Sequence, residues 1–191
     1  MKTLLSTILI LIGMFSNAQI PKKEGNIKIS PKSSLTITGD TNINSFTCVF
    51  NPNLLPSELN IIYKQTADNE FLLKNTKLIL ASDGFDCGSR AINKDFLSLI
   101  KAKQFPTIEI EVRQLKNLKV NNAEAILEIT IAGISKTFKT LIHFNESDNN
   151  YKGSLELNIN DFELSPPSKM FGLIKVKKDI DIDFNLYLDI P

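Results

Sequence analysis

The stretch DIDIDFNLYLDI, residues 179–190, alternates apolar with mostly polar side chains along its whole length. Side chains of a β-strand point alternately to its two faces, so one face of this segment is apolar and the other carries the aspartates. A helical period would spread this pattern around the circumference, and a strand buried on both faces would not tolerate the aspartates. The segment therefore predicts a long strand with one dry face, as in a β-sandwich or a β-barrel. The dry face comprises Ile180, Ile182, Phe184, Leu186, Leu188 and Ile190.

Shorter stretches with the same alternation occur along most of the chain. They predict strands at 35–38, 46–50, 57–65, 71–82, 107–115, 125–131, 138–144 and 155–159. Turns are predicted where Gly, Asn and Asp gather, at Gly39–Asp40 with the asparagines after them, at 121–122, at 132–135 and at 145–150. Residues 21–34 form a polar, partly ordered lead-in. Successive strands this close in sequence are expected to be antiparallel neighbours.

One segment has helical spacing. In INKDFLSLIKAKQFP the apolar residues Phe96, Leu97 and Ile100 follow a helical period. Asn93 is a suitable N-cap and Pro106 prevents continuation, so the sequence predicts one helix from about Lys94 to Ala102. The fold class is therefore mainly β with one main α-helix. A long sheet with a single apolar face must pack on another sheet or curl onto itself, and a closed barrel of about eight strands has room inside for side chains or one small ligand.

The N-terminus has the layout of a secretory signal peptide. Lys2 precedes an apolar core from Leu4 to Phe15, and small residues end the segment at Ala18. We predict a signal peptide over 1–18 and one domain over 19–191, with an uncleaved N-terminal anchor as the alternative. Losing Lys2 from 22 basic residues balances the 21 acidic ones, so composition gives no reason to expect a nucleic-acid partner. The mature chain is expected to lack a transmembrane segment and to be a monomer or homodimer.

Two cysteines, Cys48 and Cys87, remain in the predicted mature chain. An even count in an exported protein favours a disulfide, which would close a loop of about 40 residues and contribute on the order of 4 kcal/mol. Two buried thiols are the alternative. A redox pair lacks the Cys-x-x-Cys spacing, and two cysteines without a histidine cluster make a poor zinc site.

Reactive groups are sparse. The one histidine, His143, lies between Ile142 and Phe144, where alternation places it on the solvent face without an evident nucleophile. The aspartates at 179, 181 and 183 are spaced along one strand, too far apart for neighbours to share an ion easily. The loop SPPSKMFGLIKVKKD offers Lys169 and Lys175 to an anionic head group, although a solvated charge run explains it as well. We predict no catalysis and no cofactor.

Four stretches of the sequence form a recognisable set: SLTITGDTNINSFTCVF, INKDFLSLIKAKQFPTIEIEV, ILEITIAGISKTFKTLIHF and FELSPPSKMFGLIKVKKDIDIDFNL. In this order and spacing, over residues 35–186, they resemble the YceI-like, or polyisoprenoid-binding, proteins. The resemblance implies a lipocalin-like antiparallel barrel, exported to the periplasm or secreted, with an elongated apolar pocket for a long isoprenoid or similar amphiphilic lipid. The pair Cys48 and Cys87, which many members lack, departs from the family pattern, and a disulfide between them would narrow or rigidify one end of the barrel.

The resemblance implies that apolar residues lining the barrel carry binding, and alternation selects them. The predicted ligand-binding residues are Ile108, Ile110, Leu127, Ile129, Ile142, Phe144, Leu157, Ile159, Phe184 and Leu186. A packed barrel would give the same alternation as a hollow one. A non-catalytic structural or interaction module with a packed interior therefore stands as the alternative function.

Overall fold

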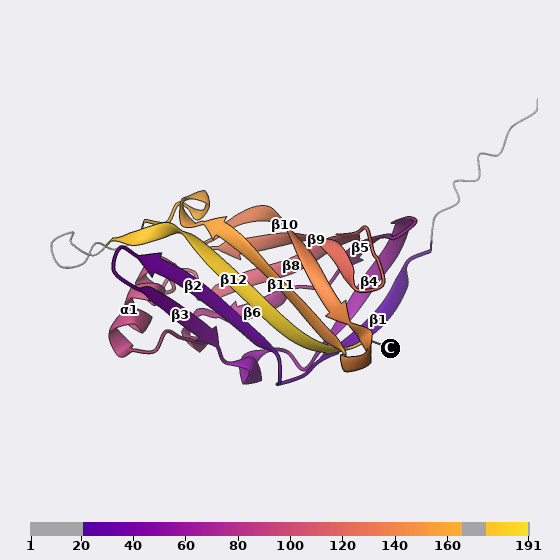
Figure 1. The fold of residues 1–191 in the computed structure, drawn as a ribbon, viewed down its shortest axis with the longest axis horizontal. Coiled ribbons are helices and arrows are strands. Elements are labelled where there is room, and N and C mark those ends of the chain that lie inside the picture. The colour runs from indigo at the N-terminus through magenta and orange to yellow at the C-terminus, as the bar shows by residue number, and fades with distance from the viewer. Residues whose placement is uncertain (1–20, 166–174, 191) are drawn as a thin grey trace, which may run out of the picture.

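A computed structural model describes residues 21–165 and 175–190. Its centre is a closed antiparallel ring of eight strands, in which β1 pairs with β12 to complete the circle (Figure 1). In spatial order the ring comprises β1 (Lys23–Ile29), β4 (Glu58–Ala67), β5 (Glu70–Lys74), β8 (Thr107–Lys116), β9 (Asn122–Ile131), β10 (Ile134–Asn145), β11 (Asn150–Asn158) and β12 (Val176–Asp189). The predicted fold class, a mainly β antiparallel barrel with one main α-helix, is confirmed.

Four further strands extend the wall at one end of the ring. β12 also pairs with β2 (Ser34–Thr41), which continues through β3 (Ser45–Phe50) to β7 (Phe85–Asp86), and β6 (Leu78–Ala81) pairs with β8. Short 3₁₀ segments lie at Pro52–Leu54, Ser82–Gly84, Glu146–Asp148 and Ile159–Phe162. The α-helix, α1 (Arg90–Leu99), lies at this end beside the β2–β3 turn. Among the residues described, no helix is long and apolar enough to cross a membrane.

The apolar face of β12 points into the barrel. Ile182 pairs with Leu155 of β11 on one side and with Ile37 of β2 on the other, and all three side chains are buried. The alternate residues, Asp181 and Asp183, are exposed on the outer face. The register thus places the dry face of β12 inside the barrel, as the alternation predicts. Ile190, which was assigned to the same face, lies beyond the end of β12 and is 47% exposed, so the prediction was wrong for this residue.

The predicted helix boundaries were wrong at both ends. α1 begins at Arg90, four residues earlier than predicted, because Ser89 is the N-cap and its side chain accepts a hydrogen bond from the Ile92 amide. It ends at Leu99, before the predicted end at Ala102. Asn93 lies within the first turns. Its side chain accepts from the Cys87 amide and donates to Asp86, which fixes the helix to the preceding loop.

Other differences come from long-range pairing. The lead-in contains β1, whose ladder hydrogen bonds to β4 and β12 compensate for its weak apolar pattern. The first and second strands both pair with the last, so sequence neighbours are not always spatial neighbours. Gly39 and Asp40 lie inside β2, and the turn occupies 42–44. The predicted strand over 71–82 is two strands, separated where Asn75 adopts a positive φ of 59°.

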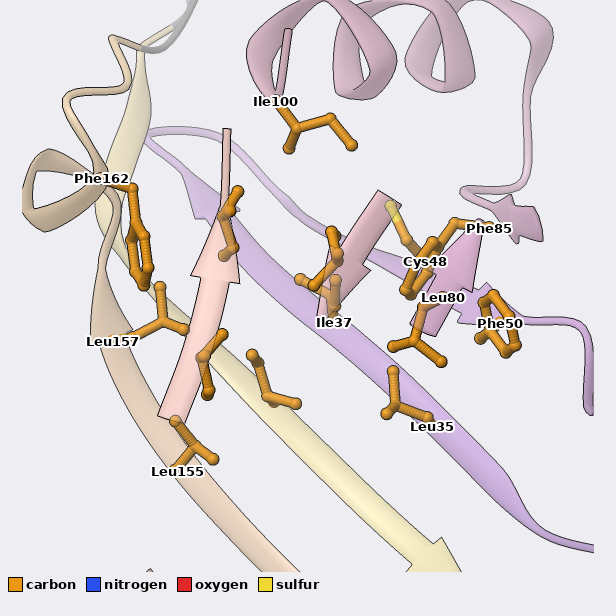
Figure 2. Packing of buried hydrophobic residues seen from close by; sticks show 14 of the residues in the cluster. Leu35, Ile37, Cys48, Phe50, Leu80, Phe85, Ile100, Leu155, Leu157 and Phe162 are labelled. Atoms are coloured by element: carbon orange, nitrogen blue, oxygen red, sulfur yellow. The ribbon is translucent and has the colours of Figure 1, made fainter. Parts of the chain in front are cut away.

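The predicted disulfide is present. Cys48 of β3 and Cys87, which follows β7, are bonded with their Cα atoms 3.9 Å apart. Both side chains are buried in the main apolar cluster. Figure 2 shows Cys48 within it. The ring of Phe85 lies 4.9 Å from that of Phe50 and 5.3 Å from that of Phe96, so aromatic contacts join β3, β7 and α1 around this bond.

Candidate functional site

The inner face of the barrel is largely apolar, with the buried Thr140 of β10 as a polar exception, and its two ends differ in burial. We call the end with α1 and the β2–β3 turn the helix end. The opposite end, with the β4–β5 turn and the β8–β9 loop, is the far end (Figure 1). Leu80, Ile129 and Phe162 toward the helix end are fully buried. Figure 2 shows Ile100 pointing from α1 toward the strands that carry Ile37 and Leu80.

A small apolar cavity lies beneath α1. Phe96, Leu99 and Ile100 of the helix side form one wall, and residues of β2, β6, β8 and β12 form much of the rest. Every lining residue is apolar, and the volume is about 40 Å³. A water molecule occupies about 30 Å³ of liquid, whereas pockets for drug-sized ligands measure roughly 300 to 1,000 Å³. The helix end is therefore close to fully packed.

The inward-facing residues of the far end are less buried. Alternation and strand register place eight apolar or aromatic side chains on the inner face there, yet each remains half-buried and stands outside the main apolar cluster. We call them the far-end group: Ile27, Tyr63, Phe71, Leu73, Phe144, Tyr151, Phe184 and Leu186. These side chains are less buried than the clustered residues toward the helix end, so the far end of the barrel is the less tightly packed one.

Aromatic side chains dominate the far-end group. The rings of Phe144 and Tyr151, on neighbouring strands, stack with their centroids 5.7 Å apart. Tyr63 and Phe71 lie 6.5 Å apart across the β4–β5 pair. Phe184 lies over Gly153, its partner on β11, where an added Cβ would overlap the ring. This part of the inner wall therefore presents aromatic faces and edges to the interior.

The ten predicted ligand-binding residues all face the interior but fall into three groups. Five belong to the buried cluster: Ile108, Leu127, Ile129, Leu157 and Ile159. Ile110 and Ile142 are half-buried and pack against it. Phe144, Phe184 and Leu186 belong to the far-end group. The far-end residues of β1, β4 and β5 were not predicted, although Leu59, Ile61 and Tyr63 alternate clearly enough to indicate that inner face.

The polar residues considered as sites lie on the outside. His143 is exposed and lines an outer groove of about 500 Å³ together with Lys152, Ser154 and Asp183. Asp179, Asp181 and Asp183 are exposed, and Asp179 accepts a hydrogen bond from Asn158. Within the described ranges, no three His, Cys, Asp or Glu side chains gather as a metal site. Lys169 lies outside those ranges, and Lys175 is exposed at the helix end.

Charge interactions also lie at the surface. Hydrogen bonding to Lys177 lowers the pKa of Asp40, and hydrogen bonds from Asn93 and the Gly88 amide lower the pKa of Asp86. Glu109 raises the pKa of Lys77, and Glu128 raises the pKa of Arg113. None of these titratable groups is among the side chains that line the cavity beneath α1, which are all apolar.

Comparisons agree with this geometry. The family model described as "YceI-like domain" matches residues 16–188. Among curated proteins, none matches this sequence.

Solved structures share the fold at low identity. The crystal structure of Burkholderia cenocepacia BcnA is similar with a TM-score of 0.63 and 15% identity, over 85% of this chain and 99% of that one. A polyisoprenoid binding domain from Saccharophagus degradans, implicated in plant cell wall breakdown, has a TM-score of 0.57 and 10% identity, over 86% and 98%. A mutant Campylobacter jejuni YCEI protein has a TM-score of 0.50 and 12% identity, over 100% and 99%.

Proposed function

Since the chain belongs to the YceI-like domain family, we propose that it is an exported binding protein that sequesters or carries a long-chain isoprenoid or a similar amphiphilic lipid. The fold is that of a binding protein. The structural neighbour from Saccharophagus degradans is described as polyisoprenoid-binding, and this supports a lipid as the ligand here.

One observation carries the proposal: a closed ring of strands surrounds inward-facing apolar side chains that are not fully packed. Half-buried apolar groups inside a barrel gain free energy by contacting an apolar chain, at about 0.8 kcal/mol for each CH₂ removed from water. The ligand contacts we propose are the ten inward-facing residues predicted from alternation. No step in this function requires a catalytic group or a cofactor.

Export is supported by the disulfide. Disulfides persist in oxidising compartments and are rare in the cytosol, so the Cys48–Cys87 bond fits a periplasmic or secreted protein. The proposed signal peptide over 1–18 lies outside the described residues. We propose residues 19–191 as the mature domain, acting as a monomer or homodimer.

A packed, non-catalytic interaction module is the second candidate. The observation that favours it is the helix-end cavity, whose volume of about 40 Å³ is far below that of a lipid-binding pocket. In this function the barrel would be a scaffold, and its outer surface would carry the interactions.

Native mass spectrometry separates the two functions. Residues 19–191 would be produced in an oxidising compartment and purified without detergent. A carrier is expected to release a co-purifying lipid on denaturation, or to retain an added polyprenol in a stoichiometric complex. A protein with no bound lipid that also fails to retain polyprenol, fatty acid or fatty alcohol would contradict the carrier and favour the packed module.

A further inference from the structure

The outer surface of the barrel carries a groove that the proposed lipid-binding function does not use. It crosses β10, β11, β12 and β2, which are consecutive in the sheet (Figure 1), and its volume is about 500 Å³. Pockets that bind small molecules measure roughly 300 to 1,000 Å³. We propose that this groove binds a short peptide with free termini, with Lys152 and His143 contacting its carboxylate and Asp183 its ammonium group. The site is independent of what the barrel interior holds.

Strand register places the charged residues of the groove in two neighbouring rows. His143 is the cross-strand partner of Lys152, so an imidazole and an ammonium group lie beside each other in the first row. Asp183 lies in the second row, paired with Ser154 on one side and Thr36 on the other. The groove is therefore basic in one row and acidic in the next.

The charges in the groove have no partner in the protein. Among the residues that the structure describes, no hydrogen bond or ion pair engages the side chains of His143, Lys152 and Asp183. Lys152 and Asp183 are diagonal neighbours across β11 and β12, and such neighbours lie roughly 7 to 8 Å apart. The exposed cross-strand pair Glu156 and Asp181 adds negative charge beyond Asp183. A ligand with one charge of each sign therefore complements the groove better than a simple anion or cation.

The separation of the charges favours a dipeptide or tripeptide. An extended chain spans at most about 3.3 to 3.6 Å per residue, so the terminal charges of a dipeptide lie about 7 Å apart. A free amino acid carries both charges on one α-carbon and is too short to reach Lys152 and Asp183 together.

The remaining groups of the groove suit a peptide backbone. The Asn185 side-chain oxygen accepts a hydrogen bond from Asn150, which leaves the Asn185 amino group to donate to a peptide carbonyl. Leu141 is 49% exposed at the edge of the groove and offers an apolar contact to a peptide side chain. Three short side chains supply hydroxyl groups and leave room between the longer ones: Ser34, Thr36 and Ser154.

His143 is the only histidine in the sequence, so its imidazole signals report directly on the groove. Protein labelled with ¹⁵N and free of a histidine tag would be titrated with alanylalanine at constant pH and followed by NMR. N-acetyl-alanylalanine lacks the ammonium group and alanylalanine amide lacks the carboxylate, so they are matched control ligands. We expect saturable shifts of the imidazole signals with alanylalanine, and binding at least about tenfold weaker for each control, because each loses one charge-assisted contact.

Single substitutions test which side chain contacts which terminus. Asp183→Asn should weaken alanylalanine binding about tenfold and leave N-acetyl-alanylalanine binding unchanged, because the acetylated peptide has no ammonium group. Lys152→Met should weaken alanylalanine binding similarly and leave binding of the amide unchanged. Lys74→Met removes an exposed lysine of β5 outside the groove and should change neither affinity.

Three results would overturn the inference. They are equal affinity for the three peptides, absence of alanylalanine binding, and binding that leaves the His143 signals in place and so lies outside the groove. None of them bears on the carrier function, which native mass spectrometry with polyprenol tests separately.

Discussion

Phe184 of β12 lies directly over Gly153, its cross-strand partner on β11, so that the ring occupies the space where a side chain at 153 would begin. The same relationship occurs between Phe46 and Gly39, where an added Cβ would be 2.5 Å from the ring. A glycine in a strand costs conformational entropy, and covering it with an aromatic ring recovers apolar contact. The absence of a side chain at Gly153 therefore allows the Phe184 ring to pack closely against the backbone of β11.

Replacing Gly153 with alanine should therefore destabilise the barrel. The new Cβ overlaps the Phe184 ring, which must rotate toward the interior, and overpacking of this kind costs about 1 to 3 kcal/mol. Chemical denaturation of the purified variant measures the loss. Adding Phe184→Leu should restore part of it, because the smaller side chain leaves room for the methyl group.

Gly25→Ala is the matched control on β1. Its Cβ would meet Ile61 and Tyr63 at 3.6 Å, which is ordinary van der Waals contact. This substitution should leave stability unchanged or raise it slightly by restricting the unfolded chain. Equal destabilisation by the two alanines would show that the Phe184 contact is not the cause.

Removing the Cys48–Cys87 bond should destabilise the protein substantially. The bond spans 39 residues in sequence, and the chain-entropy model assigns about 4 kcal/mol to a loop of this length. The double variant Cys48→Ala/Cys87→Ala is compared with the oxidised protein by denaturant unfolding. Reductant should lower the stability of the native protein and leave that of the double variant unchanged. An identical response of the two proteins would contradict a stabilising Cys48–Cys87 disulfide.

Ser89→Ala should weaken α1. Loss of the hydrogen bond from the Ile92 amide to the Ser89 side chain removes an N-cap, at a typical cost of about 1 kcal/mol. Ser98→Ala, on the exposed side of the same helix, is expected to be neutral or mildly stabilising because alanine favours helix. Thermal unfolding distinguishes them, and a neutral Ser89→Ala would mean that α1 starts elsewhere.

The helix start shows what sequence patterns could and could not give. The spacing of apolar residues located the helix, but both Ser89 and Asn93 are suitable N-caps. Only the structure shows that the Asn93 side chain instead accepts a hydrogen bond from the Cys87 amide. Alternation likewise predicted the inner faces of β8 to β12, where runs are long. Alternation did not predict β1, because the inner face of this strand includes Gly25 and has few apolar residues. The position of β1 is fixed by its pairing with β4 and β12. Alternation also could not distinguish the tightly packed helix end from the less buried far end, because the alternation is the same at both ends.

Asp86→Asn should show a pH-dependent effect. Hydrogen bonds from Asn93 and the Gly88 amide lower the Asp86 pKa below its usual 3.8, so the folded state favours the carboxylate. This stabilisation is fully present above the unfolded-state pKa and is lost as pH falls through the lower folded-state pKa. Native protein should therefore have a higher Tm than the variant at neutral pH, and the difference should shrink in acid. A difference that stays constant with pH would contradict a role for the charge.

Leu80→Ala and Leu186→Ala compare the packing of the two ends without any ligand. Leu80 is fully buried in the helix-end cluster, so truncation should cost about 2 to 5 kcal/mol through lost contacts and the cavity left behind. Leu186 faces the interior at the far end but is half-buried and outside that cluster, so truncation should cost under about 1 kcal/mol. Denaturant unfolding of lipid-free protein measures both losses.

Adding polyprenol should raise the stability of the Leu80 variant as much as that of the native protein, and raise that of the Leu186 variant less, because only the latter has lost a ligand contact. Equal costs for the two truncations would instead mean that the far end is packed like the helix end and that the barrel has no accessible interior.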